Sequence, residues 1–176
     1  MKRIARLTTP LALLVALAGP AGSDPAPQPP LSFSPGVQGT FNAEWQGVSG
    51  RTYFMQWSLD LETWQYAPFI DFGDGEHDRG LDSTSDMFFT RLHYGDFDNI
   101  TSLDEAMNGD IDGDGLSNIF EVTYGYDPFH STSTMDGPDA SLDPDQDGVG
   151  NANEQAHGTD PMVKDNPKLQ LEVIEE

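Results

Sequence analysis

Between about residue 31 and residue 95, apolar and polar positions alternate with a period of two, which is typical of half-buried β-strands. The first clear strand is predicted around residues 41–45, and the turn Gly47-Val48-Ser49-Gly50 leads to a second strand at 52–58. Further strands are predicted at 67–72 and 87–94, with a Gly- and Asp-rich loop at 73–86 between them. The apolar residues expected to share a face in the first two strands are Phe41, Ala43, Trp45, Tyr53, Met55 and Trp57. Short strands joined by turns predict a small antiparallel β-sandwich over residues 31–95.

The pattern changes near Asp96, where short helical periodicities replace the alternation. A turn of helix capped by Ser102 is expected to run through Met107. Two further short helices are predicted to stop at Gly125 and Gly158, because apolar or helix-forming residues precede each glycine. No helix is expected immediately before residue 143, since Pro138 and Pro144 lie there.

Residues 96–165 contain an acidic internal repeat. They contain 17 Asp or Glu side chains and, apart from histidine, a single basic side chain, Lys164. Residues 110–128 read DIDGDGLSNIFEVTYGYDP, and residues 143–161 read DPDQDGVGNANEQAHGTDP. Nine of these nineteen positions are identical, at a constant offset of 33 residues. A solvated low-complexity run would not repeat Gly, Asn and Glu at fixed positions, so the segment is predicted to be a pair of related structural units.

Both copies match the loop pattern D-x-[DN]-x-[DN]-G-x5-E, in which alternate residues of a tight turn supply oxygen ligands to Ca²⁺. The glycine allows the sharp turn at position six, position seven offers a carbonyl oxygen, and the final Glu supplies two oxygens. We therefore predict two Ca²⁺ sites, with ligands from Asp110, Asp112, Asp114, Leu116 (carbonyl), Asn118 and Glu121 in the first, and Asp143, Asp145, Asp147, Val149 (carbonyl), Asn151 and Glu154 in the second. Position eight, which is apolar in paired sensor EF-hands, holds Ser117 and Gly150 instead, so a calmodulin-like switch is not expected.

The spacing D-x-D-x-D-G-x-x-N-x-x-E-x-x-x-G-x-D-P over residues 110–161 resembles the bacterial thrombospondin type 3 repeat. This resemblance implies extracellular loops and short helices ordered around structural Ca²⁺, often beside adhesion or sugar-binding domains. The trailing Asp127 and Asp160 either ligate a neighbouring ion or cap a turn, and Asp-Pro favours the turn. The repeats are more widely spaced than in tight arrays.

A less specific resemblance concerns the β part. Gly50-Arg51-Thr52-Tyr53, followed by Gln56-x-Ser58-x-Asp60-Leu61-x-x-Trp64, resembles a small fibronectin type III-like β module of bacterial exported proteins. Residues 88–92, Phe-Phe-Thr-Arg-Leu, could correspond to the strand that closes such a module. That family implies no fixed activity.

The two ends of the chain are predicted to lie outside the folded part. Lys2, Arg3 and Arg6 precede a short apolar run and then small residues, which is the pattern of a secretory signal peptide over residues 1–22. The apolar run is about half of the roughly 20 residues that a membrane-spanning helix needs. A Pro-rich linker is expected at 23–30, and residues 166–176 form either a tail or a strand. The protein is therefore expected to be secreted or on the cell surface, without a membrane span after cleavage.

Composition narrows the function further. The 176 residues carry a formal net charge of −22 and contain no cysteine, which argues against nucleic-acid binding, thiolate zinc sites and cysteine catalysis. The acids with informative spacing are assigned to calcium, so we expect a non-enzymatic calcium-binding module of structural or adhesion type, with an extracellular protein or polysaccharide as a possible partner. The alternative is a carbohydrate-binding accessory protein. Its sugar-stacking platform would come from aromatic residues that we assign instead to the sandwich core: Trp45, Trp57, Trp64, Tyr53 and Tyr66.

Overall fold

The computed structural model describes residues 27, 30–36, 40–81 and 88–164. The predicted signal peptide at 1–22 and the tail at 166–176 lie outside the described residues, as does almost all of the linker predicted at 23–30. Within the described residues, no helix is long and apolar enough to cross a membrane.

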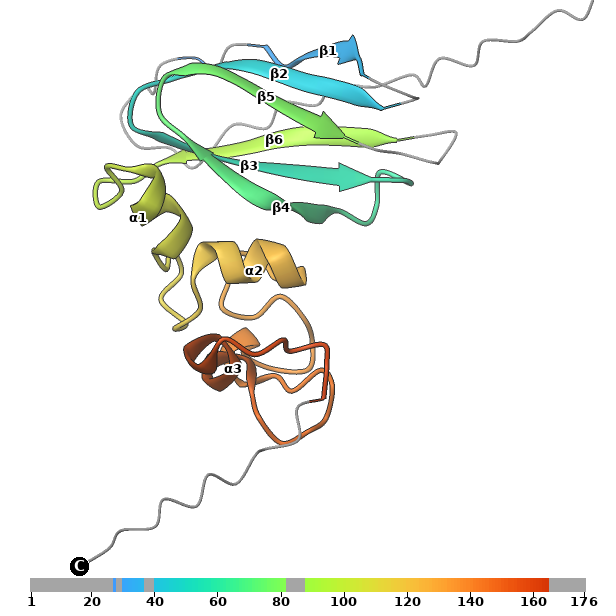
Figure 1. Ribbon diagram of the computed structural model, residues 1–176, viewed down its shortest axis with the longest axis vertical. Coiled ribbons are helices and arrows are strands. Elements are labelled where there is room, and N and C mark those ends of the chain that lie inside the picture. Colours follow the sequence, from blue (N-terminus) through green and yellow to red (C-terminus); the bar gives the residue numbers. More distant parts are fainter. Residues whose placement is uncertain (1–26, 28–29, 37–39, 82–87, 165–176) are drawn as a thin grey trace, which may run out of the picture.

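The described part is mainly β, with two three-stranded antiparallel sheets followed by short helices and acidic loops (Figure 1), as the sequence predicted. One sheet has the order β1-β2-β5, and the other has the order β4-β3-β6. The strands span Ser32–Pro35 (β1), Phe41–Gly47 (β2), Arg51–Ser58 (β3), Gln65–Phe72 (β4), Gly75–Leu81 (β5) and Phe89–Asp96 (β6).

Strand β5 corrects the prediction of a loop at 73–86. It pairs with β2 along its whole length, from Leu81 opposite Phe41 to Gly75 opposite Gly47. The strand escaped detection because two of its three less exposed positions are polar. His77 stacks on the Trp45 ring with centroids 5.2 Å apart, and Arg79 forms an ion pair with the buried Asp71 of β4. Ring stacking and an ion pair therefore stabilise the inward face of β5, where the other strands have apolar side chains.

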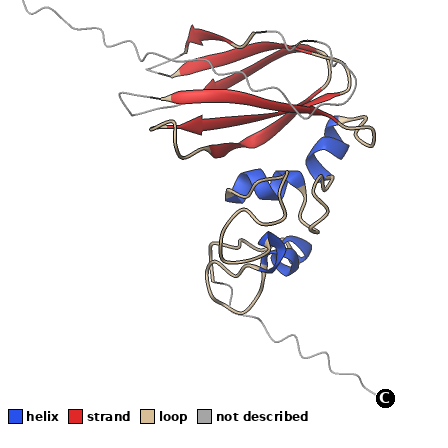
Figure 2. Ribbon diagram, turned by 180° about the vertical axis from the view of Figure 1, so that it is seen from behind, coloured by secondary structure: helices blue, strands red, loops and turns tan. Residues whose placement is uncertain are grey.

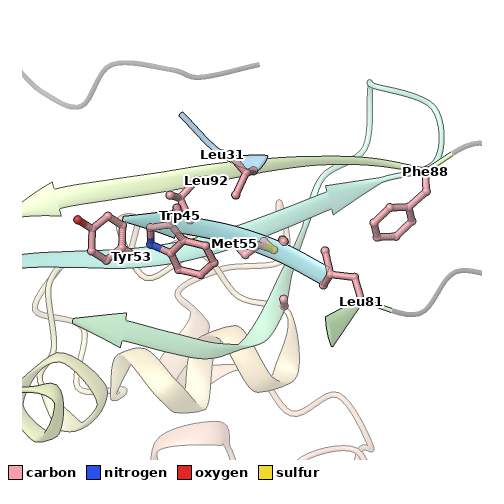
Figure 3. Close-up of a cluster of buried hydrophobic side chains, with 9 residues drawn as sticks. Leu31, Trp45, Tyr53, Met55, Leu81, Phe88 and Leu92 are labelled. Atoms are coloured by element: carbon pink, nitrogen blue, oxygen red, sulfur yellow. The ribbon is translucent and has the colours of Figure 1, made fainter. Parts of the chain in front are cut away.

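The main hydrophobic core lies between the two sheets (Figure 3). Trp45 from β2 meets Tyr53 and Met55 from β3, and all three side chains are buried. The partly buried Trp57 stacks on Phe88 with ring centroids 6.0 Å apart. The predicted inward face of the first two strands is therefore confirmed, and Trp45 and Tyr53 belong to the core.

A second core joins the β4-β3-β6 sheet to the helices that follow it. Helix α1 spans Leu103–Asn108 and helix α2 spans Asn118–Tyr124, and both pack against β4 (Figures 1 and 2). The buried cluster comprises Phe54, Tyr66, Ile70, Ile100, Ala106 and Val122. Because both faces of the sheet are covered, β3 is buried on both sides from Arg51 to Gln56, whereas the alternating pattern had predicted one buried face.

The remaining elements are a short 3-10 helix, η2, at Asp139–Ser141 and helix α3 at Asn151–His157. The predicted caps are present. Ser102 accepts a hydrogen bond from the Glu105 amide at the start of α1, and Gly125 and Gly158 end α2 and α3 in the left-handed conformation. The turn η2 lies where no helix was expected, just after Pro138.

Candidate metal centre

The first acidic loop is built by aspartates that accept hydrogen bonds from the backbone of the loop itself. Asp110 accepts from the amides of Gly113 and Gly115, at 2.6 and 2.9 Å. Asp114 accepts from the Leu116 amide at 2.8 Å. Gly115 has a φ of +100°, which only glycine adopts without strain, so the predicted sharp turn at position six is present. These bonds turn the carboxylates toward the inside of the loop.

The second loop repeats this arrangement 33 residues later. The Gly148 amide donates to Asp143 at 2.9 Å, and the Val149 amide donates to Asp147 at 2.8 Å. Gly148 has a φ of +95°. Gln146 occupies the position of Gly113 and has a φ of +61°, although it carries a side chain. The internal repeat in the sequence therefore corresponds to two copies of one loop structure.

The carboxylates of each loop converge. One oxygen from each of Asp110, Asp112 and Asp114 lies within 4.8 Å of the others, and the same holds for the three aspartates of the second loop, Asp143, Asp145 and Asp147. A third group within the same distance joins Asp114 and Glu121 to Asp139. The first site thus gathers carboxylates from its loop, from helix α2 and from η2.

Glu121 shows that this cluster fits a cation. Its side chain is 0% exposed, and neither carboxylate oxygen has a hydrogen-bond partner among the described residues. One oxygen each of Asp112 and Asp114 is buried without a partner as well. Burial, reinforced by the negative charge of Asp112, raises the pKa of Glu121 to about 9, and burial raises the pKa of Asp112 to about 6. Buried carboxylate oxygens with no donor are the ligands that Ca²⁺ takes, so the residues present fit this ion.

The two asparagines at position nine lie at the base of their loops. Asn118 is fully buried, accepts a hydrogen bond from the Ile111 amide at 3.1 Å and donates to the Ala106 carbonyl at 2.9 Å. Asn151 donates to the Asp139 carbonyl at 2.7 Å in the corresponding way. Pro144 replaces Ile111 in the second loop and has no amide to donate. These contacts tie each exit helix to the segment that enters its loop.

The other predicted ligands occupy the expected parts of the loops. Leu116 is fully buried in a small core with Phe120 and Tyr126, whereas Val149 is partly exposed. Glu154 is fully buried on α3, and Thr159 donates to its carboxylate at 3.5 Å. Ligation by the Leu116 and Val149 carbonyls stays a prediction.

Asp139 is the residue that the loop pattern missed. It lies between the repeats, is 0% exposed, and accepts hydrogen bonds from the Ser133 amide on both carboxylate oxygens at 2.9 Å. In the 33-residue register it aligns with Ala106, which has no ligand atom in its side chain. No motif within a single repeat could therefore have identified it.

Asp127 and Asp160 cap turns, as the Asp-Pro pattern favoured. Asp127 accepts from the Phe129 amide at 3.1 Å, and Asp160 accepts from the Met162 amide at 3.0 Å. Asp127 also accepts a hydrogen bond from the Tyr66 hydroxyl at 3.0 Å, which links the end of the first repeat to strand β4. These side chains therefore support the chain after each helix.

Comparison with known families matches the two loops and their exit helices. Residues 110–130 and 143–164 each match the family described as the bacterial TSP3 repeat. No curated protein and no solved structure matches the chain. The family match agrees with the repeated loop geometry and with the converging carboxylates. The segments 110–130 and 143–164 are bacterial TSP3 repeats, which implies that their acidic loops bind calcium.

Proposed function

We propose that this protein is an exported structural module of adhesion type, whose two acidic loops each order around one Ca²⁺ and make the helical region rigid. The observation that carries the proposal is the buried, unpartnered carboxylate of Glu121 among the loop aspartates. Export rests on the signal-peptide pattern at 1–22. The proposal assigns no catalytic role, because the acids at informative positions serve as calcium ligands.

The coupling between calcium and folding follows from electrostatics. Carboxylates brought within 4.8 Å repel one another and lose hydration, so the loops are unfavourable without a cation. Because Ca²⁺ binds the folded loops and not the unfolded chain, its binding free energy stabilises the fold. Extracellular calcium modules bind at about 10⁻⁴ to 10⁻³ M, which suits a calcium-rich exterior.

The contacts between the helices and the β part extend this effect to the sandwich. Val122 of α2 is 1% exposed and lies in the same cluster as Phe54 and Ile70 of the sheet. Phe129, just after the first repeat, packs edge-on against Phe54 and stacks on His93, with centroid distances of 5.0 and 4.3 Å. In the proposal, calcium therefore fixes the helices against the sheet, and the sandwich presents the surface that meets an extracellular partner.

The carbohydrate-binding alternative needs exposed aromatic rings. Trp45, Tyr53 and Tyr66 are each at most 8% exposed, and the ring of the partly exposed Trp64 is covered by the Arg91 guanidinium at 4.1 Å. Trp45 and Tyr53 lie in the sandwich core as predicted, whereas Tyr66 lies in the second core and Trp64 belongs to none of the buried clusters of the described residues. None of these rings offers a bare stacking surface, so we retain the structural module as the proposed function.

Calorimetric titration of the calcium-depleted full chain tests the proposal, with Mg²⁺ as the competing ion. We expect two Ca²⁺ per chain, a rise in the far-ultraviolet circular dichroism signal of the helices, and loss of both sites in the Glu121→Gln, Glu154→Gln double variant. Equal affinity for Mg²⁺, or no saturable binding, would show that the acidic region is only a spacer.

A further inference from the structure

We propose that Asp139 is a ligand of the first calcium site, supplied from outside its loop, so that this site is complete only when the two repeats are folded together. This inference rests on the proposed calcium-binding function. Asp139 belongs to η2, immediately before the second loop, yet its carboxylate lies within 4.8 Å of ligand atoms of Asp114 and Glu121.

Glu121 points to a ligand shared by these three residues. It is fully buried, and both of its oxygens lack a hydrogen-bond partner among the described residues. A positive side chain would satisfy it, but the strongest electrostatic effects on Glu121 come from the acids Asp110, Asp112, Asp114 and Asp139. A divalent cation between Asp114, Glu121 and Asp139 accounts for this concentration of buried negative charge.

The hydrogen bonds of Asp139 leave it able to bind a cation. The Ser133 amide and hydroxyl donate to its carboxylate, and together they fix its orientation. Two carboxylate oxygens offer about four acceptor positions, so lone pairs remain for a metal. If Asp139 only held Ser133, asparagine would accept the amide hydrogen bond without placing another negative charge beside Asp114 and Glu121.

The backbone of Asp139 connects this ligand to the second repeat. Its carbonyl accepts hydrogen bonds from the Asn151 side chain at 2.7 Å and from the Leu142 amide at 3.2 Å. Asn151 begins helix α3, which carries Glu154 of the second site. Calcium at the first site therefore holds η2 in the position that receives α3.

Gln155 provides a second tie between the repeats. From α3 it accepts hydrogen bonds from the Ser117 amide and hydroxyl at 2.7 and 2.9 Å, and it donates to the Gly115 carbonyl at 3.1 Å. Gln155 of the second repeat thus holds the first loop at both Gly115 and Ser117. We expect calcium to bind more tightly at the first site than at the second, and each occupied site to favour binding at the other.

The matched comparison is Asp139→Asn against Asp136→Asn in the full chain. Both variants remove one negative charge from the same connecting segment, but Asp136 is exposed and belongs to none of the carboxylate groups found among the described residues. In a calorimetric Ca²⁺ titration, Asp139→Asn is expected to weaken the tighter site by about tenfold or more. Asp136→Asn is expected to stay within about twofold of the unaltered chain, since an exposed distant charge is largely screened.

A second measurement detects ligation directly. Eu³⁺ luminescence lifetimes in H₂O and D₂O count the waters on the bound ion, and a Glu154→Gln background confines the ion to the first site. Asp139→Asn is expected to add about one water to that ion, because a lost protein oxygen is replaced by solvent.

The outcomes separate the two proposals. If the unaltered chain binds two Ca²⁺ while Asp139→Asn matches Asp136→Asn in both affinity and hydration, Asp139 is not a ligand and this inference fails alone. If the unaltered chain binds no Ca²⁺, the proposed function itself fails.

Discussion

Replacing Glu121 by glutamine is predicted to change stability in opposite directions with and without calcium. The carboxyl group has an ordinary pKa of 4.5 that rises to about 9 in the folded, calcium-free protein. At pH 7, which is about 2.5 units above its ordinary pKa, this group is ionised in the unfolded chain and must take up a proton when folding buries it. At about 1.4 kcal/mol per unit, the charge of Glu121 destabilises the calcium-free fold by about 3 kcal/mol. Glutamine removes that cost, but it also removes a carboxylate that we propose binds calcium through both oxygens.

Urea unfolding followed by far-ultraviolet circular dichroism measures both effects. In EGTA, Glu121→Gln is expected to stabilise the folded helical region relative to its unfolded state by up to about 3 kcal/mol, which restores part of its helical signal without calcium. In saturating calcium the same substitution is expected to lower the free energy of unfolding, with calcium affinity reduced by about one to two orders of magnitude. Glu62→Gln is the control, because Glu62 is exposed on the β3–β4 connection. If Glu121→Gln destabilised the protein equally in EGTA and in calcium, Glu121 would be an ordinary structural residue and the reasoning would be refuted.

Three further predictions follow from the structure. Because the pKa of Glu121 is raised, the calcium-free protein is expected to lose stability as the pH rises from about 5 to about 9, whereas the stabilisation by a fixed calcium concentration grows over the same range. The melting temperatures in EGTA and in calcium should therefore differ more at the upper end of this range than at the lower end, and an equal difference at both ends would contradict the prediction. Gln146→Gly is expected to stabilise the second loop by about 0.5–1 kcal/mol, because Gln146 has a φ of +61° where the first loop has glycine. Urea unfolding in calcium measures this gain. A lower free energy of unfolding would contradict the prediction. Val122→Ala is expected to lower the free energy of unfolding by about 2 kcal/mol, since Val122 is buried in the core shared by sheet and helices. The unfolding transitions seen by tryptophan fluorescence and by helical dichroism should shift together. Separate transitions would show that the β-sandwich and the helical region unfold independently.

Local sequence patterns predicted several strands and helix ends of this fold, because these features depend on residues that are close together in the chain. The alternation of apolar residues identified β2 and β3, and glycines marked the ends of α2 and α3. Strand β5 was missed because His77 and Arg79 occupy its less exposed face, where only Trp45 stacking and the Asp71 ion pair make them suitable. The two-sided burial of β3 depends on helices that follow it in the chain, and periodicity within the strand carries no information about them.

The candidate site also has a part that local spacing predicted and a part that depends on distant segments of the chain. The loop aspartates and Glu121 could be predicted because their spacing is set by the turn that they form. Asp139 could not be, because it reaches the first loop only when the segment between the repeats folds back. Asn118 and Asn151 were predicted as calcium ligands from their repeated positions, and their ligation stays a prediction. The structure shows that both side chains hydrogen-bond to the segments entering each loop, which the loop pattern does not predict.

Hydrogen–deuterium exchange with and without calcium tests the central claim most directly, because it reports order in each helix separately. We predict that the amides of α2 and α3 gain strong protection when calcium is added, while those of the central strand β3 are protected in both conditions. Exchange in α2 and α3 that is slow in EGTA and unchanged by calcium would contradict the account, because the loops would then be ordered without the ion.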